Sequence, residues 1–448
     1  MRVIFRRAVN FTAFNAATVA FFIFLMIVGH AAGAQSETFA KEYTASASVR
    51  ALSDAQALRD GQVSTYYRMD PGEVLTVKTE NTIAGLYLEF YSQSVPGTIT
   101  TVNGTKFFGA SGFLHEYIVL EEAEAKTLEI VFPSGAKLSE LRIFGAGTLP
   151  SDVQVWRPPY ERADALLLTP HSDDEHLSFA GVLPWMIAQD YDCQVAYFCS
   201  HAQNPIRLHE QLNGLWAVGV THYPVLGVYP DSYSESMQQA LAKLSADGYT
   251  EEDLIGYQVE LLRRFKPYVV VGPDTNGEYG HGAHMLNAYA LQQALEVSGD
   301  RDAYPQSSRL YGAWDVPKAY LHLWNERKIV MNFDLPLEYY GGKTAYEMSV
   351  AGYMCHRSQH WTWFTEWLIG TKSKPLESAA QIQYYSPCMY GLYRSTVGDD
   401  TLKNDFFEHI LFEAEQPKLS DVIYTGKAVK TAVVTALDAA PASESCSE

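Results

Sequence analysis

The sequence is poor in positive charge. Its 448 residues include 33 Lys and Arg against 52 Asp and Glu, and the formal net charge is −19. Nucleic acids and anionic membrane surfaces attract basic proteins, so this balance argues against both as partners. We therefore expect a soluble acidic protein.

Cysteine is also scarce. The chain has five cysteines and no Cys-x-x-Cys pair, so it has neither a dense disulfide framework nor the spacing of a thiolate zinc site. Cys193 and Cys199 lie in an apolar stretch, where small buried core residues are the ordinary expectation. We therefore assign no disulfide and no cysteine-bound metal.

Long apolar runs are absent after residue 34. Before that point, three arginines precede an apolar stretch at 16–28 and the small residues Ala32-Gly33-Ala34, which is the pattern of a secretory signal peptide over 1–34. The apolar stretch of about 13 residues is shorter than the roughly 20 that span a bilayer. We expect a secreted or extracytoplasmic protein, with an uncleaved N-terminal anchor as the alternative.

Residues 35–150 show the pattern of an all-β region. Short alternating runs at 86–91, 117–120 and 128–132 are separated by turn signals such as Pro-Gly and Asn-Gly. This spacing predicts a β-sandwich. The region is similar to the discoidin or galactose-binding-like domains that are often attached to secreted carbohydrate-active enzymes.

A different pattern fills residues 160–430. Apolar strands alternate with amphipathic helical segments, which predicts an α/β fold with a Rossmann-like, mostly parallel sheet and helices on both faces. The tail at 431–448 is rich in Ala, Ser and acidic residues and is expected to be disordered. The predicted strands are 165–169, 194–199 and 268–272, and the predicted helices are 179–188, 206–218 and 251–265.

Two polar clusters follow predicted strands. "PHSDDE" follows 165–169, and "GEYGHGAH" follows the strand "YVVVG". Ligands of open α/β sheets bind outside the carboxyl ends of the strands. His281 and His284 are three residues apart at the start of a helix, so both rings can face one crevice. Together His171, Asp174 and His284 provide two imidazoles and one carboxylate, a set that suits a catalytic zinc ion with an open position.

These clusters resemble the motifs of the LmbE-like or PIG-L superfamily, the N-acetylglucosaminyl-phosphatidylinositol and mycothiol-type de-N-acetylases. "PHSDDE" is similar to the family's His-Pro-Asp-Asp-Glu loop, and "HGAH" to its distal His-x-x-His. Arg207-x-x-Glu210, the segment at 217–220 and "HRSQ" at 356–359 are similar as well. The resemblance covers residues 165–359, and its motifs are specific only in combination.

The resemblance implies roles for individual residues. Asp173 would be the general base, and His281 would stabilise the oxyanion or protonate the leaving amine. Arg207 and Asp231 are candidates for binding sugar hydroxyls. The resemblance implies one divalent ion, zinc with iron(II) as the alternative, held by His171, Asp174 and His284.

The sequence departs from the family pattern at two places. Ser172 replaces the usual proline, which should loosen the loop slightly. Gly282-Ala283 replaces Pro-Asp inside the distal motif, and this removes a carboxylate that would orient one of the two histidines. Without that carboxylate, the basicity of His281 is open to question.

The remaining histidines and an aromatic run have ordinary expectations. We expect structural or surface roles for His176, His201, His209 and His222. For His356 and for His360, a structural role and a site-lining role are equally expected. An aromatic stripe at helical spacing usually faces a core. We therefore expect burial of Trp361, Trp363, Phe364 and Trp367.

The leading functional hypothesis is a secreted, zinc-dependent amide hydrolase that removes the N-acetyl group from an N-acetylglucosamine-type sugar or glycoconjugate. Zinc lowers the pKa of bound water from about 15.7 to about 7, which makes a nucleophile available near neutral pH. The alternatives are a family hydrolase of another amide-bearing metabolite and a non-catalytic glycan-binding surface protein.

Overall fold

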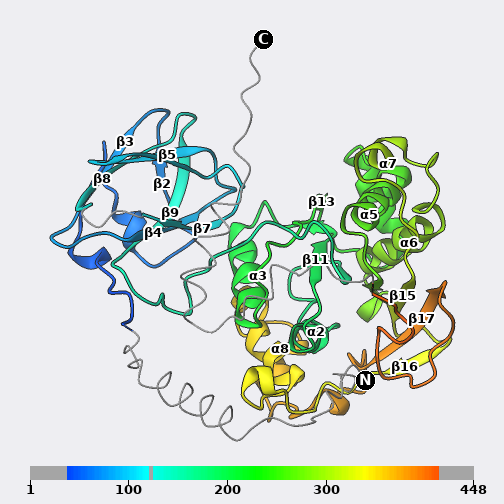
Figure 1. Ribbon diagram of the computed structural model, residues 1–448. Helices are drawn as coiled ribbons and strands as arrows, with labels where there is room; N and C mark the ends of the chain where they lie inside the picture. The colour runs from blue at the N-terminus through cyan, green and yellow to red at the C-terminus, as the bar shows by residue number, and fades with distance from the viewer. Residues whose placement is uncertain (1–37, 121–124, 413–448) are drawn as a thin grey trace, which may run out of the picture.

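The computed structural model describes residues 38–120 and 125–412 (Figure 1). The predicted signal peptide at 1–34 and tail at 431–448 lie outside these residues. Within the two described ranges, no helix combines the length and apolar character that crossing a bilayer requires.

The N-terminal region consists mostly of two antiparallel sheets. One has the strand order β1-β3-β8-β5-β6 and the other β2-β9-β4-β7. Apolar side chains from both sheets, such as Ile130 in the first and Leu141 in the second, form one buried core. The β content agrees with the sequence, and a galactose-binding-like fold stays a prediction. The strands are β1 Ser48–Arg50, β2 Tyr67–Met69, β3 Val74–Lys78, β4 Gly85–Phe90, β5 Gly97–Thr101, β6 Gly104–Phe108, β7 His115–Val119, β8 Thr127–Val131 and β9 Ala136–Phe144.

A six-stranded mixed sheet forms the centre of the second region. Its order is β11-β10-β14-β15-β17-β16, in which the first four strands pair in parallel and β17 pairs antiparallel with both β15 and β16. The region is therefore mixed α/β, and its Rossmann-like character stays a prediction. A separate two-stranded pair, β12 with β13, lies after β11. The strands are β10 Ala165–Thr169, β11 Cys193–Tyr197, β12 Cys199–Ser200, β13 Tyr229–Pro230, β14 Val269–Gly272, β15 Lys318–His322, β16 Lys328–Val330 and β17 Met389–Ser395.

Helices cover both faces of the mixed sheet. Successive side chains of a strand point to opposite faces, and in β10 Leu167 packs with α2, α3 and α8 while Leu166 and Leu168 pack with α5 and α6. The sequence dictates the start of α5 through a capping box between Thr250 and Asp253. The helices are α2 Val182–Ala188, α3 Pro205–Ala217, α4 Met237–Ala246, α5 Glu251–Phe265, α6 Gly282–Val297, α7 Pro305–Tyr311, α8 Ala345–Tyr353 and α9 Phe364–Ile369.

The order of strands places the two polar clusters together. Strand β10 pairs in parallel with β11 on one side and with β14 on the other. The chain thus leaves the centre of the sheet in both directions, and loops at such a switch point diverge to form a crevice. The loop after β10 carries the first cluster, and the loop after β14 carries the second.

The two regions of the chain are in direct contact. The ring of Phe113, ahead of β7, stacks on Tyr223 with centroids 4.2 Å apart, and the backbone N–H of Leu114 donates to the Tyr223 hydroxyl at 3.1 Å. Both Phe113 and Leu114 belong to the apolar core that contains α2 and α3. The predicted domain limits at 150 and 160 stay predictions.

The expected burial of the aromatic run is wrong for two of its members. Trp361 is 81% exposed and Trp363 47% exposed, whereas Phe364 is buried. Helix α9 begins only at Phe364, so the two tryptophans precede it. They do not share the helical face that the spacing predicts.

Candidate active site

Three side chains converge at the carboxyl ends of β10 and β14. Asp174 Oδ2 accepts the backbone N–H of His171 at 2.9 Å and lies 3.2 Å from His171 Nδ1 and 3.3 Å from His284 Nε2. The two ring nitrogens are 3.0 Å apart. All three residues are buried. The structure therefore brings together the three ligands that the sequence predicts from separate strand ends.

This triangle of donor atoms fits a tetrahedral metal ion. Zinc with bonds of about 2.1 Å sets neighbouring ligand atoms about 3.4 Å apart, and the observed separations of 3.0–3.3 Å need to open by only a few tenths of an ångström. Burial opposes a charge on His171, yet Cys199, Asp231 and Asp174 raise its pKa well above the ordinary value. The surroundings thus favour positive charge at the position a cation would take.

Carboxylates also orient the outer nitrogens of both histidines. Asp231 Oδ1 lies 3.2 Å from His171 Nε2, and Glu278 Oε2 lies 2.5 Å from His284 Nδ1. The other oxygen of Glu278 is 2.6 Å from His322 Nδ1. Such partners fix the ring orientation and the tautomer of metal-binding histidines.

Glu278 supplies an orienting carboxylate that the distal motif lacks. Burial opposes its charge, but the hydrogen bonds with His284 and His322 hold its pKa well below the usual range. Glu278 is part of "GEYGHGAH", but the sequence pattern predicts no role for it. Its position six residues before His284, across a turn, gave no periodic signal, and His322 comes from the distant strand β15.

Asp173 lies beside the triangle in an unusual backbone conformation. Its φ is 114°, a value that L residues rarely adopt, and its N–H donates to Glu175 Oε2 at 2.9 Å. Burial raises the pKa of Asp173 to about 7, with Arg207 opposing the shift and Asp174 adding to it. A carboxylate with a pKa near neutrality suits a general base.

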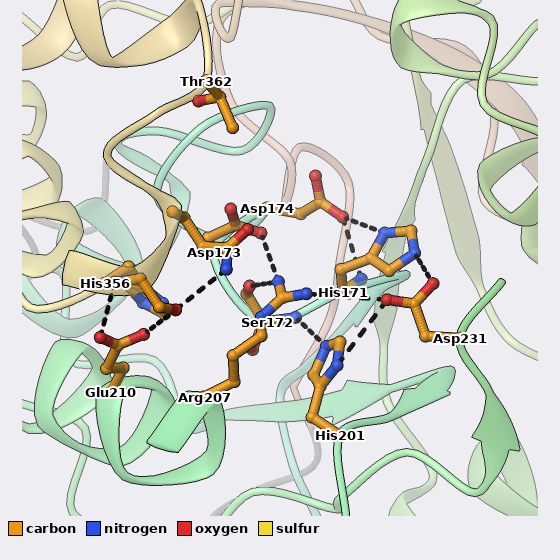
Figure 2. Close-up of polar contacts among 12 residues, drawn as sticks. His171, Ser172, Asp173, Asp174, His201, Arg207, Glu210, Asp231, His356 and Thr362 are labelled. Carbon is orange, nitrogen blue, oxygen red and sulfur yellow. Dashed lines mark hydrogen bonds and ion pairs between the residues drawn. The ribbon is translucent and has the colours of Figure 1, made fainter. Parts of the chain in front are cut away.

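Figure 2 shows Arg207 between the carboxylates of Asp173 and Asp231. Its Nη2 donates to the carbonyl of Ser172 at 2.6 Å and lies 3.4 Å from Asp173 Oδ1, and its Nη1 lies 3.6 Å from Asp231 Oδ2. The structure thus places both predicted sugar-binding residues in the site, in contact with protein groups. Their role in substrate binding stays a prediction.

His201 also belongs to the site, although the sequence predicts a structural or surface role for it. It is buried, and its Nε2 accepts the N–H of Ser172 at 3.2 Å. Its Nδ1 lies 3.8 Å from Asp231 Oδ2. Isolated in the sequence after β12, His201 matches no motif, so only its position in the fold reveals the contact.

His281 faces the same crevice from the N-terminus of α6. Its ring centroid lies 4.8 Å from that of His171 and 5.1 Å from that of Tyr233. Its buried Nδ1 has no hydrogen-bond partner among the described residues. Burial, with His171 and His284 nearby, lowers the pKa of His281 to about 3. The ring is therefore neutral at pH 7 and can donate a hydrogen bond to a developing oxyanion.

Comparison with known proteins places the site within a recognisable segment. Residues 166–295 match the family model described as PIG-L, GlcNAc-PI de-N-acetylase. The segment contains His171, Asp173, Asp174, His281 and His284, so the candidate site lies within the matched residues.

Among curated proteins, a 1D-myo-inositol 2-acetamido-2-deoxy-alpha-D-glucopyranoside deacetylase of Saccharopolyspora erythraea is 41% identical over 69 residues, 15% of this chain and 24% of the relative. One from Geodermatophilus obscurus is 31% identical over 118 residues, 25% of this chain and 39% of the relative. The chain thus spans less than half the length of either. The solved N,N'-diacetylchitobiose deacetylase of Pyrococcus horikoshii is 16% identical, with a TM-score of 0.34 over 47% of this chain and 77% of that one.

Proposed function

We propose that the protein is a metal-dependent hydrolase that removes the N-acetyl group from an N-acetylglucosamine-type sugar or conjugate. The observation that carries this proposal is the triangle of His171, Asp174 and His284 with Asp173 beside it, inside the segment that matches the de-N-acetylase family. The two curated relatives named above are deacetylases of an acetamido-glucopyranoside. We propose zinc as the metal, with iron(II) as the alternative. The proposal also includes a Rossmann-like sheet and a secreted location.

The three ligand atoms would be His171 Nδ1, Asp174 Oδ2 and His284 Nε2, because the other ring nitrogens face Asp231 and Glu278. A bound divalent ion supplies Lewis acidity, which makes water more acidic and an acyl oxygen more electrophilic.

Asp173 then performs the proton transfer. Its carboxylate takes a proton from the attacking water, the water oxygen bonds to the acetyl carbon, and the carbon–nitrogen bond breaks as the protonated Asp173 returns that proton to the nitrogen. The products are acetate and a free amine. The neutral His281 donates a hydrogen bond to the oxyanion, a contribution that preorganised donors make in many hydrolases.

Arg207 keeps Asp173 in position from within the site. Its side chain is only 13% exposed and touches Asp173, Asp231 and the Ser172 carbonyl. Together with the half-buried Asp231 it would meet the hydroxyl groups of a sugar. A purely glycan-binding function leaves the complete ligand set and the raised pKa of Asp173 without a role.

A released-acetate assay tests this function. The purified protein is incubated with a panel of N-acetylglucosamine conjugates, first with a chelator and then after zinc or iron(II) is restored. We expect acetate release that the chelator abolishes and the metal restores. His171→Ala and His284→Ala should lose both the ion bound at this site and the activity. A double variant that keeps full metal occupancy would refute the ligand assignment, and acetate release unaffected by chelation would refute metal dependence.

A further inference from the structure

A second cluster of potential ligands lies behind the candidate active-site loop. It consists of Glu175, His176 and His356, and all three side chains are completely buried. Glu175 and His176 directly follow Asp174 in the chain, whereas His356 comes from the segment after α8. None of the three is among the residues that the proposed function uses.

Most polar atoms of this cluster make no well-formed hydrogen bond. Both ring nitrogens of His176, both of His356 and Oε1 of Glu175 are buried without a hydrogen bond of good geometry among the described residues, and their closest polar contacts are the ion pairs of the two rings with Glu175 Oε1. Polar groups so deeply buried are almost always satisfied by protein, water or an ion. Five unsatisfied atoms within one cluster therefore indicate an absent partner.

The distances match a metal ion as that partner. His356 Nε2 lies 3.3 Å and His176 Nε2 3.7 Å from Glu175 Oε1. These values lie on either side of the roughly 3.4 Å between ligands of tetrahedral zinc. One ligand atom from each of the three residues lies within 4.8 Å of the other two.

Two glycines make room for the imidazoles. A Cβ at Gly214 would lie 2.7 Å from His356 Nε2 and 2.9 Å from His176 Nε2, and one at Gly352 would lie 2.4 Å from His176 Cε1. Larger residues in α3 and α8 would therefore displace both rings.

A comparable cluster elsewhere in the molecule is more fully hydrogen-bonded, although its His209 Nε2 also lacks a hydrogen-bond partner among the described residues. Glu89, His115 and His209 also have ligand atoms within 4.8 Å of one another. There, both nitrogens of His115 are engaged, Nδ1 with the Tyr87 hydroxyl at 2.7 Å and Nε2 with His209 Nδ1 at 2.6 Å. That cluster is bridged by hydrogen bonds, whereas the cluster around Glu175 is not.

We propose that Glu175, His176 and His356 form a second site for a divalent transition-metal ion, distinct from the one at His171. Two imidazoles and a carboxylate are a ligand set typical of zinc. The ion would act structurally, because Glu175 Oε2 accepts the N–H of Asp173 and thereby holds its positive-φ backbone.

Counting bound zinc in solution tests the second site. The full chain is stripped with a chelator, loaded with Zn2+, dialysed and analysed by elemental mass spectrometry. We expect two equivalents in the wild type. His176→Leu and His356→Leu should each lose one equivalent and retain the other, while His171→Ala should lose the other one. His222→Asn, which changes a mostly buried histidine stacked on Tyr160, should keep both.

Anomalous diffraction at the zinc edge gives a result that needs no variant. Crystals of the zinc-loaded wild type should show a peak among Glu175, His176 and His356. The absence of that peak at full occupancy of the His171 site, or one equivalent in the wild type retained by His356→Leu, would overturn the second site. Neither result would affect the proposed hydrolase, which depends on the first site.

Discussion

The two regions of the molecule place their polar side chains differently. In the N-terminal region, strand β3 alternates between exposed and buried residues, so its polar groups lie along the strand in contact with water. In the α/β region, every residue of β10 is buried, and the ionisable groups follow only after the strand ends. A sheet covered on both faces has no solvated face for charge. Its charged groups therefore gather at the loops, where they face one another.

Strong pKa shifts occur in both regions wherever an ionisable side chain is buried, and in the N-terminal region burial raises the pKa of Glu89 and of Glu140 to about 7. Side chains in the crevice are buried and surrounded by other ionisable groups, as the raised pKa of Asp173 and the lowered pKa of His281 show. In the N-terminal region, the carboxylate of Asp60 is exposed; burial acts to raise its pKa, but hydrogen bonds with Thr65 and Gln62 together lower it below the ordinary value. Clustered perturbations of this kind mark functional sites more often than isolated ones.

The largest expected effect separates two neighbouring aspartates of the α/β region. Asp173→Asn keeps the size of the side chain but cannot accept a proton, so kcat should fall by about 10²–10⁴ while metal remains bound. Asp174→Asn removes a ligand charge, and metal binding itself should weaken. Turnover and metal content are measured for both variants.

Two outcomes would contradict this assignment. If Asp173→Asn loses metal and Asp174→Asn retains it, the two roles are reversed. If Asp173→Asn keeps wild-type turnover, Asp173 is not the general base. Glu252→Gln, at the exposed N-terminus of α5, is the control for a surface carboxylate and should change neither measurement.

The sequence predicts this region well where a strong local signal exists. Strand β10 and helix α5 have the predicted limits, because a continuous apolar run and a capping box define them. The ligand triangle follows from two motifs and the rule that sites form at strand ends. Helix α4 was not predicted. The strands β16 and β17 were not predicted either, because their antiparallel pairing depends on distant segments rather than on local periodicity.

Residues that act through another side chain were the hardest to predict. Glu278 and His201 lie in no matched motif position, and their roles depend on contacts with His284 and Ser172. Local sequence patterns cannot identify such partners, because the fold of the whole sheet determines which side chains come into contact.

An intermediate effect is expected for the carboxylate behind His284. Glu278→Gln removes the charge that orients this ring and should weaken metal affinity by about 10–100-fold. Asp231→Asn, the equivalent change behind His171, should have a smaller effect because Asp231 is partly exposed to water. Competitive titration against a fluorescent chelator measures both affinities. Unchanged affinity in Glu278→Gln would show that His284 does not need its partner.

The smallest expected effect concerns the contact between the two regions. The Tyr223 hydroxyl accepts the N–H of the buried Leu114, so Tyr223→Phe leaves that N–H unsatisfied. The free energy of unfolding should fall by about 1 kcal/mol, the lower end of the cost of an unpaired buried donor. Turnover should be unchanged, because Tyr223 is not among the residues assigned to the site.

Tyr257→Phe is the matched control, since its hydroxyl donates to the Tyr197 carbonyl entirely within the α/β region. Urea unfolding followed by both tryptophan fluorescence and far-UV circular dichroism distinguishes the two. If only Tyr223→Phe separates the transitions of the two probes, the N-terminal region is coupled to the α/β core through this contact. If Tyr257→Phe is destabilised and Tyr223→Phe is not, the N-terminal region and the α/β core fold independently of that hydrogen bond.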